Sequence, residues 1–298
     1  MLHDSANLAA MAEALGKSTD YRVLRRLTAR SAMKASIGQG ATTGVLLDVE
    51  TTGLDPQKDE VIELGMVKFE YQDDGRIAGL RDVFAAFNEP TVAISKEVTA
   101  LTGIDGKMVA GRRIDEAAVS AFVDDVTIVI AHNAAFDRKF AERYWPLFEH
   151  KAWGCSATEI EWRKHGFDGA RLGWLLNSAG FFHQAHRAVD DCHALLEILD
   201  LKLPATGAPA LALLLEHARK KTIRVWAEQS PFELKDTLKR RGYRWSDGAD
   251  GRARSWYVDI EESSVENEIA FLRSHIYLRH VEPRLQTLTA LTRFSSRV

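Results

Sequence analysis

The order of apolar segments predicts an α/β or α+β domain around one mixed sheet, followed by a smaller α+β domain. Runs of strand formers come first, and helical patterns then alternate with strands. The run 126–130 is apolar and rich in β-branched residues, which is typical of a buried strand. A Pro- and Gly-containing segment at 203–209 reads as a linker, and the composition changes after it.

The composition is that of a globular protein with a sizeable core. The chain has 298 residues, of which 46% are hydrophobic and 27% charged. No apolar run is long enough to span a bilayer, and the N-terminus lacks the pattern of a signal peptide. The two cysteines, Cys155 and Cys192, are too few for a disulfide framework or a cysteine-based zinc site. We therefore expect a cytoplasmic protein without a membrane partner.

The charge is unevenly distributed. Residues 1–204 hold 23 Lys/Arg and 30 Asp/Glu, whereas residues 205–298 hold 16 and 12. An acidic half beside a basic half fits a metal site next to a polyanion-binding surface, and it also fits ordinary surface variation.

In the first half, helices are predicted over residues 1–35, with Ser18, Thr19 and Asp20 as N-cap candidates before a second helix at 21–27. Residues 36–44 read as a linker. Strands are predicted at 45–50, 61–69 and near 80–87. Two helical patterns follow within 93–125, separated by 103–111. Beyond the strand at 126–130, helices are expected to Tyr144, around 172–176 and over 188–201.

The second half is expected to alternate helix and strand. Helices are predicted at 210–220, 231–241 and 262–280, and strands at 222–227 and 255–259. A final helix is expected over Gln286–Phe294.

Two acidic residues, Asp48 and Glu50, interrupt the first strand. Residues i and i+2 of a strand point to the same face, so both carboxylates should converge near the strand's end. Two close carboxylates repel each other unless a cation binds them, and Mg²⁺ or Mn²⁺ prefers such oxygen ligands. The alternative is one core-facing and one solvated acid.

Two further acids are candidates for the same site. Asp137 follows the buried strand at a helix N-terminus, where helix capping alone would explain an Asp. Asp191 lies in the first turns of a later helix, and a solvated position is the default there. Asp190 should point about 100° away from Asp191 on that helix.

Five short motifs then carry a family resemblance. Asp48-Val49-Glu50-Thr51-Thr52-Gly53-Leu54-Asp55, Ile62–Gly65, Leu101–Ile104, Ala131–Asp137 and His186–Asp191 resemble, in order, the motifs of the DEDDh exonucleases. This DnaQ-like family is typified by the proofreading epsilon subunit of bacterial DNA polymerase III. The resemblance covers about residues 42–201.

The resemblance implies a ribonuclease-H-like, mixed five-stranded sheet flanked by helices. It also implies two divalent cations, Mg²⁺ or Mn²⁺, held by Asp48, Glu50, Asp137 and Asp191. The activity it implies is 3′→5′ hydrolysis that releases nucleoside monophosphates. His186 would be the general base, since an imidazole pKa near 6.5 suits that role; without the motif, a surface histidine would be the better interpretation.

The same resemblance points to substrate-binding residues. Thr51, Thr52 and Leu54 would line the pocket for the 3′-terminal nucleotide. His132 and Asn133 would contact the scissile phosphate or position Asp137, with loop hydrogen bonding as the alternative. His183 and His193 are expected at the surface, because no Cys/His set of zinc-ligand spacing surrounds them.

The chain is thus divided into an N-terminal helical extension and linker (1–41), an exonuclease domain (42–203) and a basic, aromatic domain (210–298). Residues 219–254 hold 11 Lys/Arg and 5 Asp/Glu interleaved with aromatics, which fits either single-strand binding or a small aromatic core. If the domain presents single strands, deleting 205–298 should weaken binding and leave dinucleotide turnover intact.

The predicted function is proofreading or repair at single-stranded DNA 3′ ends. One alternative is an exoribonuclease of the same fold, since the four acids do not read the sugar. Another is a nucleic-acid-binding subunit that partners a DNA polymerase.

Overall fold

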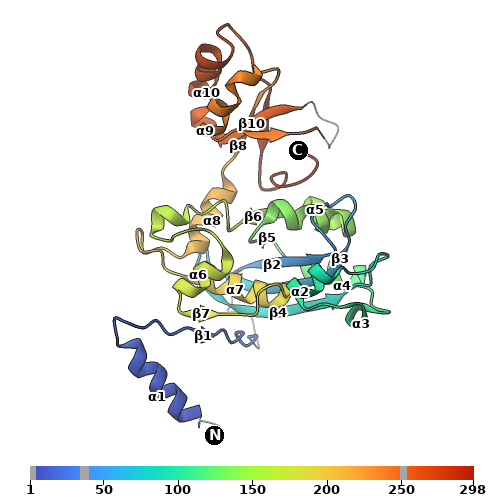
Figure 1. Cartoon of the computed structure of the whole chain (residues 1–298), viewed down its shortest axis with the longest axis vertical. Helices are drawn as coiled ribbons and strands as arrows, with labels where there is room; N and C mark the ends of the chain where they lie inside the picture. The colour runs from blue at the N-terminus through green and yellow to red at the C-terminus, as the bar shows by residue number, and fades with distance from the viewer. Residues whose placement is uncertain (1–4, 34–39, 249–253) are drawn as a thin grey trace.

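The computed structural model describes residues 5–33, 40–248 and 254–298. Its larger body, here the five-stranded part, is built on a mixed sheet of order β4-β3-β2-β5-β6 (Figure 1). Strands β2, β3 and β4 are antiparallel neighbours, and β5 and β6 continue the sheet in parallel to β2. The predicted fold class is therefore confirmed. The strands are β2 (Thr42–Thr51), β3 (Val61–Tyr71), β4 (Ile77–Phe87), β5 (Ile128–Ala131) and β6 (Ala152–Cys155).

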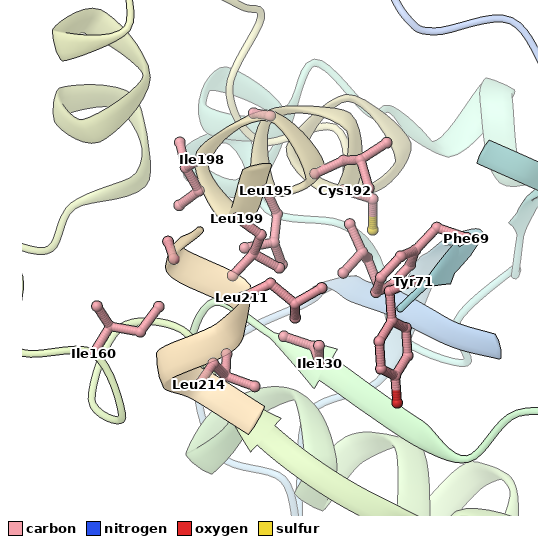
Figure 2. Close-up of a cluster of buried hydrophobic side chains, with 14 of the residues drawn as sticks. Phe69, Tyr71, Ile130, Ile160, Cys192, Leu195, Ile198, Leu199, Leu211 and Leu214 are labelled. Carbon is pink, nitrogen blue, oxygen red and sulfur yellow. The ribbon is translucent and has the colours of Figure 1, made fainter. Parts of the chain in front are cut away.

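Helices cover both faces of this sheet because successive strand residues point to opposite sides. Leu46 of β2 packs with one set of helices, and its neighbours Val45 and Leu47 pack with the other. The first set is α6 (Leu172–Ser178), α7 (Ala188–Asp200) and α8 (Ala210–Arg219), and the second is α4 (Glu116–Val123) and α5 (Ala134–Tyr144). Figure 2 shows Leu195 and Leu199 of α7 in one cluster with α8.

Residues 93–125 form three helices where two were predicted. They are α2 (Lys96–Thr102), α3 (Gly106–Val109) and α4. The additional helix α3 lies inside the segment expected to separate two helices, and Asp105 caps it by accepting from the backbone of Lys107 and Met108. No helix among the described residues combines the length and apolarity needed to cross a bilayer.

Within the described residues 5–33, the N-terminal segment is helical only over α1 (Ser5–Gly16). The helix predicted at 21–27 is wrong: Arg25–Arg26 form strand β1, parallel to β7 (Phe181–Phe182). Backbone hydrogen bonds to the β7 segment replace those of a helix. Further along, Arg30 pairs with Glu197 and Asp200 of α7. These tertiary contacts outweigh local helix propensity.

The predicted linker 36–44 is also shorter than expected, because β2 already begins at Thr42. Its residues 36–39 lie outside the described part of the chain.

The rest of the chain forms a second sheet, here the four-stranded part, of order β11-β8-β10-β9. Its elements are β8 (Thr222–Ala227), α9 (Lys235–Arg240), β9 (Arg244–Ser246), β10 (Ser255–Glu261), α10 (Val265–Phe271) and β11 (Leu285–Leu288). The final helix expected over Gln286–Phe294 is wrong, because Leu285–Leu288 pair with β8 and complete the sheet.

Helix α8 and the last residues of the chain both pack on the five-stranded part. Leu211 and Leu214 of α8 lie in the cluster with α7. The buried Arg138 side chain of α5 donates to the carbonyls of Ala290, Leu291 and Arg293. We propose that the domain boundary follows α8. Deleting residues 205–298 would accordingly remove part of the larger core.

Candidate functional site

Strand β2 positions the first two acids at its carboxyl end. Asp48 and Glu50 are two residues apart, and the sheet register shifts immediately after Glu50, where β2 bulges against β3. One oxygen each of Asp48, Glu50 and Asp191 lie within 4.8 Å of one another. The convergence expected from the i, i+2 spacing is thus present, and a residue from a distant helix joins it.

Asp137 enters from the first turn of α5 and is buried. Its Oδ1 accepts a hydrogen bond from the backbone N–H of Val49, at 3.3 Å. Since Val49 lies between Asp48 and Glu50, this bond fixes Asp137 directly beside the two strand acids. The side chain does not serve as the N-cap of α5, because the N-cap position is Asn133.

Asp191 reaches the site because α7 approaches β3 unusually closely. A Cβ at Gly65 would lie 2.4 Å from both the carbonyl carbon of Ala188 and the nitrogen of Val189. Only glycine lets the two backbones meet at this distance. The first turn of α7 therefore packs directly on the sheet beside Asp48.

Hydrogen bonds occupy both oxygens of Asp191. Oδ1 lies 2.7 Å from Nε2 of His183, and Oδ2 accepts from the backbone N–H groups of His186 and Arg187 at 2.7 and 3.1 Å. The expectation that His183 lies at the surface is wrong, because its side chain is 6% exposed and holds Asp191. His193 is likewise buried on α7.

Burial and mutual repulsion raise the pKa values of these acids. Loss of solvent, with the charges of Asp191 and Glu63 next, raises the pKa of Glu50 to about 8. Burial also raises the pKa of Asp137 to about 7, and burial followed by the charge of Asp137 raises the pKa of Asp48 well above its usual range. A cluster of carboxylates with so little compensation fits divalent cations, whose charge would offset the repulsion.

Sequence reasoning missed a fifth acid. Glu63 of β3 lies opposite Glu50 in the sheet register and is buried. Arg187 compensates it, with Nη2 at 2.9 Å from Oε1, and the Ala188 N–H donates to the same carboxylate. The signal was present: Glu63 is the one charged residue in the apolar run 61–67. Its role here is to tie the start of α7 to β3.

His186 is placed by its backbone. Its φ of 63° lies in the left-handed region, and its N–H bonds Asp191, so the residue lies directly beside the acids. Its ring is exposed and makes no hydrogen bond to any residue in the described ranges. An exposed imidazole next to the carboxylates is free to meet a solvent molecule.

The predicted substrate residues divide into two groups. Thr51 and Thr52 shape the turn after β2, since Thr51 Oγ1 donates to the Gly53 carbonyl at 2.6 Å and Thr52 Oγ1 accepts from the Glu60 N–H at 2.9 Å. His132 is engaged in loop hydrogen bonding, with its ring nitrogens 2.8 Å from Ser156 Oγ and 2.6 Å from the Ala170 carbonyl.

Leu54 and Asn133 lie together at the surface. Leu54 is 84% exposed, and both residues line a hollow of about 210 Å³, which Pro56, Ala135, Phe136 and Lys139 complete. The hollow adjoins the turn that follows Glu50. An exposed leucine at the rim of such a hollow can pack against a flat apolar surface such as a base.

Comparison with known proteins agrees with this geometry. The RNase_T family model, described as "Exonuclease", matches residues 45–199, which is more than half of the chain. DNA polymerase III PolC-type of Thermotoga petrophila is 41% identical over 172 residues, covering 52% of this chain and 11% of that protein. Its counterpart in Caldanaerobacter subterraneus is 32% identical over 160 residues, with 52% and 11% covered. The chain spans about a tenth of the length of these relatives.

Two matched solved structures are those of exonucleases. The zinc-bound complex of E. coli exonuclease I with single-stranded DNA has a TM-score of 0.49 and 14% identity, covering 78% of this chain and 71% of that chain. Exonuclease X in complex with 5′ overhanging duplex DNA has a TM-score of 0.40 and 22% identity, covering 58% and 89%.

Proposed function

Because this chain belongs to the exonuclease family whose model spans residues 45–199, we propose that it is a metal-dependent 3′→5′ exonuclease acting on DNA ends. The observation that carries the proposal is the convergence of Asp48, Glu50 and Asp191, with Asp137 bonded to the strand between the first two. A purely structural role would not require four acids, three of them with raised pKa values, at one point.

The four carboxylates would hold two divalent cations, which would supply charge to activate a water molecule and to stabilise the leaving 3′-oxygen. Other residues of the chain would offset charge, orient Asp191 and accept a proton. Arg187 pairs with Glu63 and offsets part of the negative charge that this fifth acid adds beside Glu50. His183 and the His186 N–H hold Asp191 in one orientation. The His186 ring would accept the proton of the attacking water.

The substrate end would bind beside the turn after β2. Leu54 and Asn133 line the hollow next to that turn and would receive the 3′-terminal nucleotide. Association with a DNA polymerase is proposed on the names of the relatives given above, and a role in proofreading or repair on the resemblance of the motifs to the DEDDh exonucleases.

The test is degradation of matched 5′-labelled single-stranded DNA and RNA with Mg²⁺, Mn²⁺ or EDTA. We expect a ladder of DNA products shortened stepwise from the 3′ end, present with either cation and absent with EDTA. Faster shortening of RNA would replace DNA by RNA as the substrate. Binding of both strands with no shortening of either would contradict the enzyme proposal and favour a binding subunit.

A further inference from the structure

A large cleft separates the five-stranded part from the four-stranded part. It has a volume of about 1010 Å³. One wall is the segment 55–58 together with Lys139 and Arg143 of α5, and the other is a face of β8, β9 and β10. Figure 1 shows the two sheets one above the other, with α8 leading from the larger to the smaller.

The second wall carries a row of aromatic and guanidinium groups. Arg244 and Trp226 both lie opposite Tyr257 in the sheet register, so the three side chains share one face. The rings of Tyr257 and Trp226 are 5.2 Å apart, and the guanidinium of Arg244 lies 5.1 Å from the Tyr257 centroid. Trp226 is 2% exposed and supports the row, while Tyr257 is half-buried and Arg244 exposed.

This face is not the core side of its sheet. The alternate residues of β8, Ile223 and Val225, pack with Leu238 and Leu272 from the helical side. The opposite face carries polar and aromatic groups, and Trp226, Arg244 and Tyr257 of this face line the cleft. Tyr257, the half-buried ring of this face, lies beside guanidinium groups, and aromatic and guanidinium groups together can stack a base and bind phosphates.

The charges of the cleft leave a positive excess along its centre. Asp259 is shared by Arg224 and Arg244, at 2.7 and 2.8 Å, so one carboxylate faces two cations. On the opposite wall Arg143 donates only to the carbonyls of Pro56 and Asp59, and Lys139 has no ion pair within the described ranges.

The acids of the cleft are compensated or lie at its margins. Glu159 pairs with Arg293, and Asp55 pairs with Lys58. Asp247 follows the end of β9, and Glu261 is the last residue of β10, so both lie at the ends of the open face. In the middle of the face, the guanidinium groups of Arg224 and Arg244 lie 4.4 and 5.1 Å from the centroid of the Tyr257 ring.

The cleft adjoins the hollow next to the candidate active site. The hollow that holds Leu54 and Asn133 shares Pro56, Ala135 and Lys139 with the cleft. A strand whose 3′ end lies in the hollow would pass Lys139, which lines both the hollow and the cleft.

We propose that the cleft binds single-stranded DNA on the 5′ side of the terminal nucleotides, with a base stacked on Tyr257 and phosphates held by Arg244 and Lys139. This inference rests on the proposed function, because it extends the path of the same substrate. The four-stranded part would then bind the single strand whose 3′ end the active site shortens. A substrate as short as a dinucleotide would not reach this part of the cleft.

The test compares a labelled single strand of about 20 nucleotides with a dinucleotide, using the double variant Arg244→Ala/Tyr257→Ala. Loss of one stacked base and one phosphate contact should raise KM for the long strand roughly tenfold or more. It should also reduce the magnitude of the slope of the logarithm of the strand-binding constant against the logarithm of the salt concentration by about 0.7. Turnover number on the long strand and kcat/KM for the dinucleotide should stay at wild-type values. Arg244 can be removed without leaving Asp259 unpaired, because Arg224 remains bonded to it.

The matched control is Arg240→Ala/Trp245→Ala, which removes the same kinds of groups outside the cleft lining. Trp245 belongs to the same strand as Arg244 but points to its other face. An equal loss in this control, or an unchanged KM in the test variant, would overturn the proposal. Should the test variant fail to fold, Lys139→Ala on the other wall must still weaken binding of the long strand.

Binding of the labelled long strand, measured by fluorescence anisotropy in the presence of EDTA, distinguishes the exonuclease proposal from the cleft proposal. If the wild type degrades neither substrate, the exonuclease proposal fails, yet weaker binding by the test variant alone would still support the cleft. If both substrates are degraded equally well by every variant and binding is unchanged, only the cleft proposal fails. A cleft that serves a protein partner would give this second outcome.

Discussion

Replacing Gly65 by alanine should separate Asp191 from the other acids. The new Cβ would lie 2.4 Å from backbone atoms of Ala188 and Val189, and neither can rotate away as a side chain would. Ordinary contact requires about 3.5–4.0 Å, so α7 must move by about 1 Å or more. Overpacking of this kind costs about 1–3 kcal/mol of stability, and a displacement of about 1 Å at a catalytic group can cost about a hundredfold in rate.

The assay is urea unfolding together with the rate of strand shortening. The matched control is Gly173→Ala in helix α6, where a Cβ would meet nothing within 4 Å. That change should stabilise the protein by about 0.5–1 kcal/mol and leave activity unchanged. A Gly65→Ala protein as stable and as active as the wild type would refute the argument that this close approach positions Asp191.

Other predictions concern protons, buried charges and histidines. In the metal-free folded state the pKa values of Glu50 and Asp137 are about 8 and 7, whereas their ordinary values are 4.5 and 3.8. Because the folded state therefore binds more protons than the unfolded state, the free energy of unfolding should fall as the pH rises from about 4.5 to 8. Mn²⁺ must displace those protons, and its stabilising effect on Tm should be larger at pH 8 than at pH 6; equal shifts would contradict the raised pKa values. Arg138→Ala should lower the free energy of unfolding in urea by about 3–5 kcal/mol, because it leaves buried Glu142 without its main partner. The control Arg297→Ala removes a 39% exposed partner of the same Glu142 and should lower it by less than about 1 kcal/mol. His183→Ala should weaken Mn²⁺ binding in calorimetry about 10- to 100-fold, since it removes the partner of Asp191 Oδ1. His186→Ala should lower kcat about 10²- to 10⁴-fold with Mn²⁺ affinity retained; the reverse pattern would exchange the two roles.

The sequence predicts the sheet well because its strands carry strong periodic signals. Apolar runs mark β2, β3 and β5, and the acids on β2 stand out against that background. Strand β6 lacks such a run: Ala152–Cys155 is only four residues long and contains glycine. Its place in the sheet depends on pairing with β5, which no local pattern expresses.

The sequence predicts the acidic residues of the site but not the residues that form hydrogen bonds with them. Spacing brings Asp48 and Glu50 to one face, and the motifs single out Asp137 and Asp191. The contact between His183 and Asp191 depends on how the chain folds back before α7, and a lone histidine gives no signal of it. The N-terminal strand at Arg25 is a similar case, since its hydrogen bonds go to residues about 155 positions away.

The most direct test of the four-acid site compares two neighbouring aspartates of α7. Asp191→Asn and Asp190→Asn remove the same charge one residue apart, but only Asp191 has an oxygen within 4.8 Å of those of Asp48 and Glu50. Strand shortening and Mn²⁺ binding should be lost in the Asp191 variant and kept in the Asp190 variant. Activity that survives the Asp191 change, or that falls equally in both, would contradict a metal site built from these carboxylates.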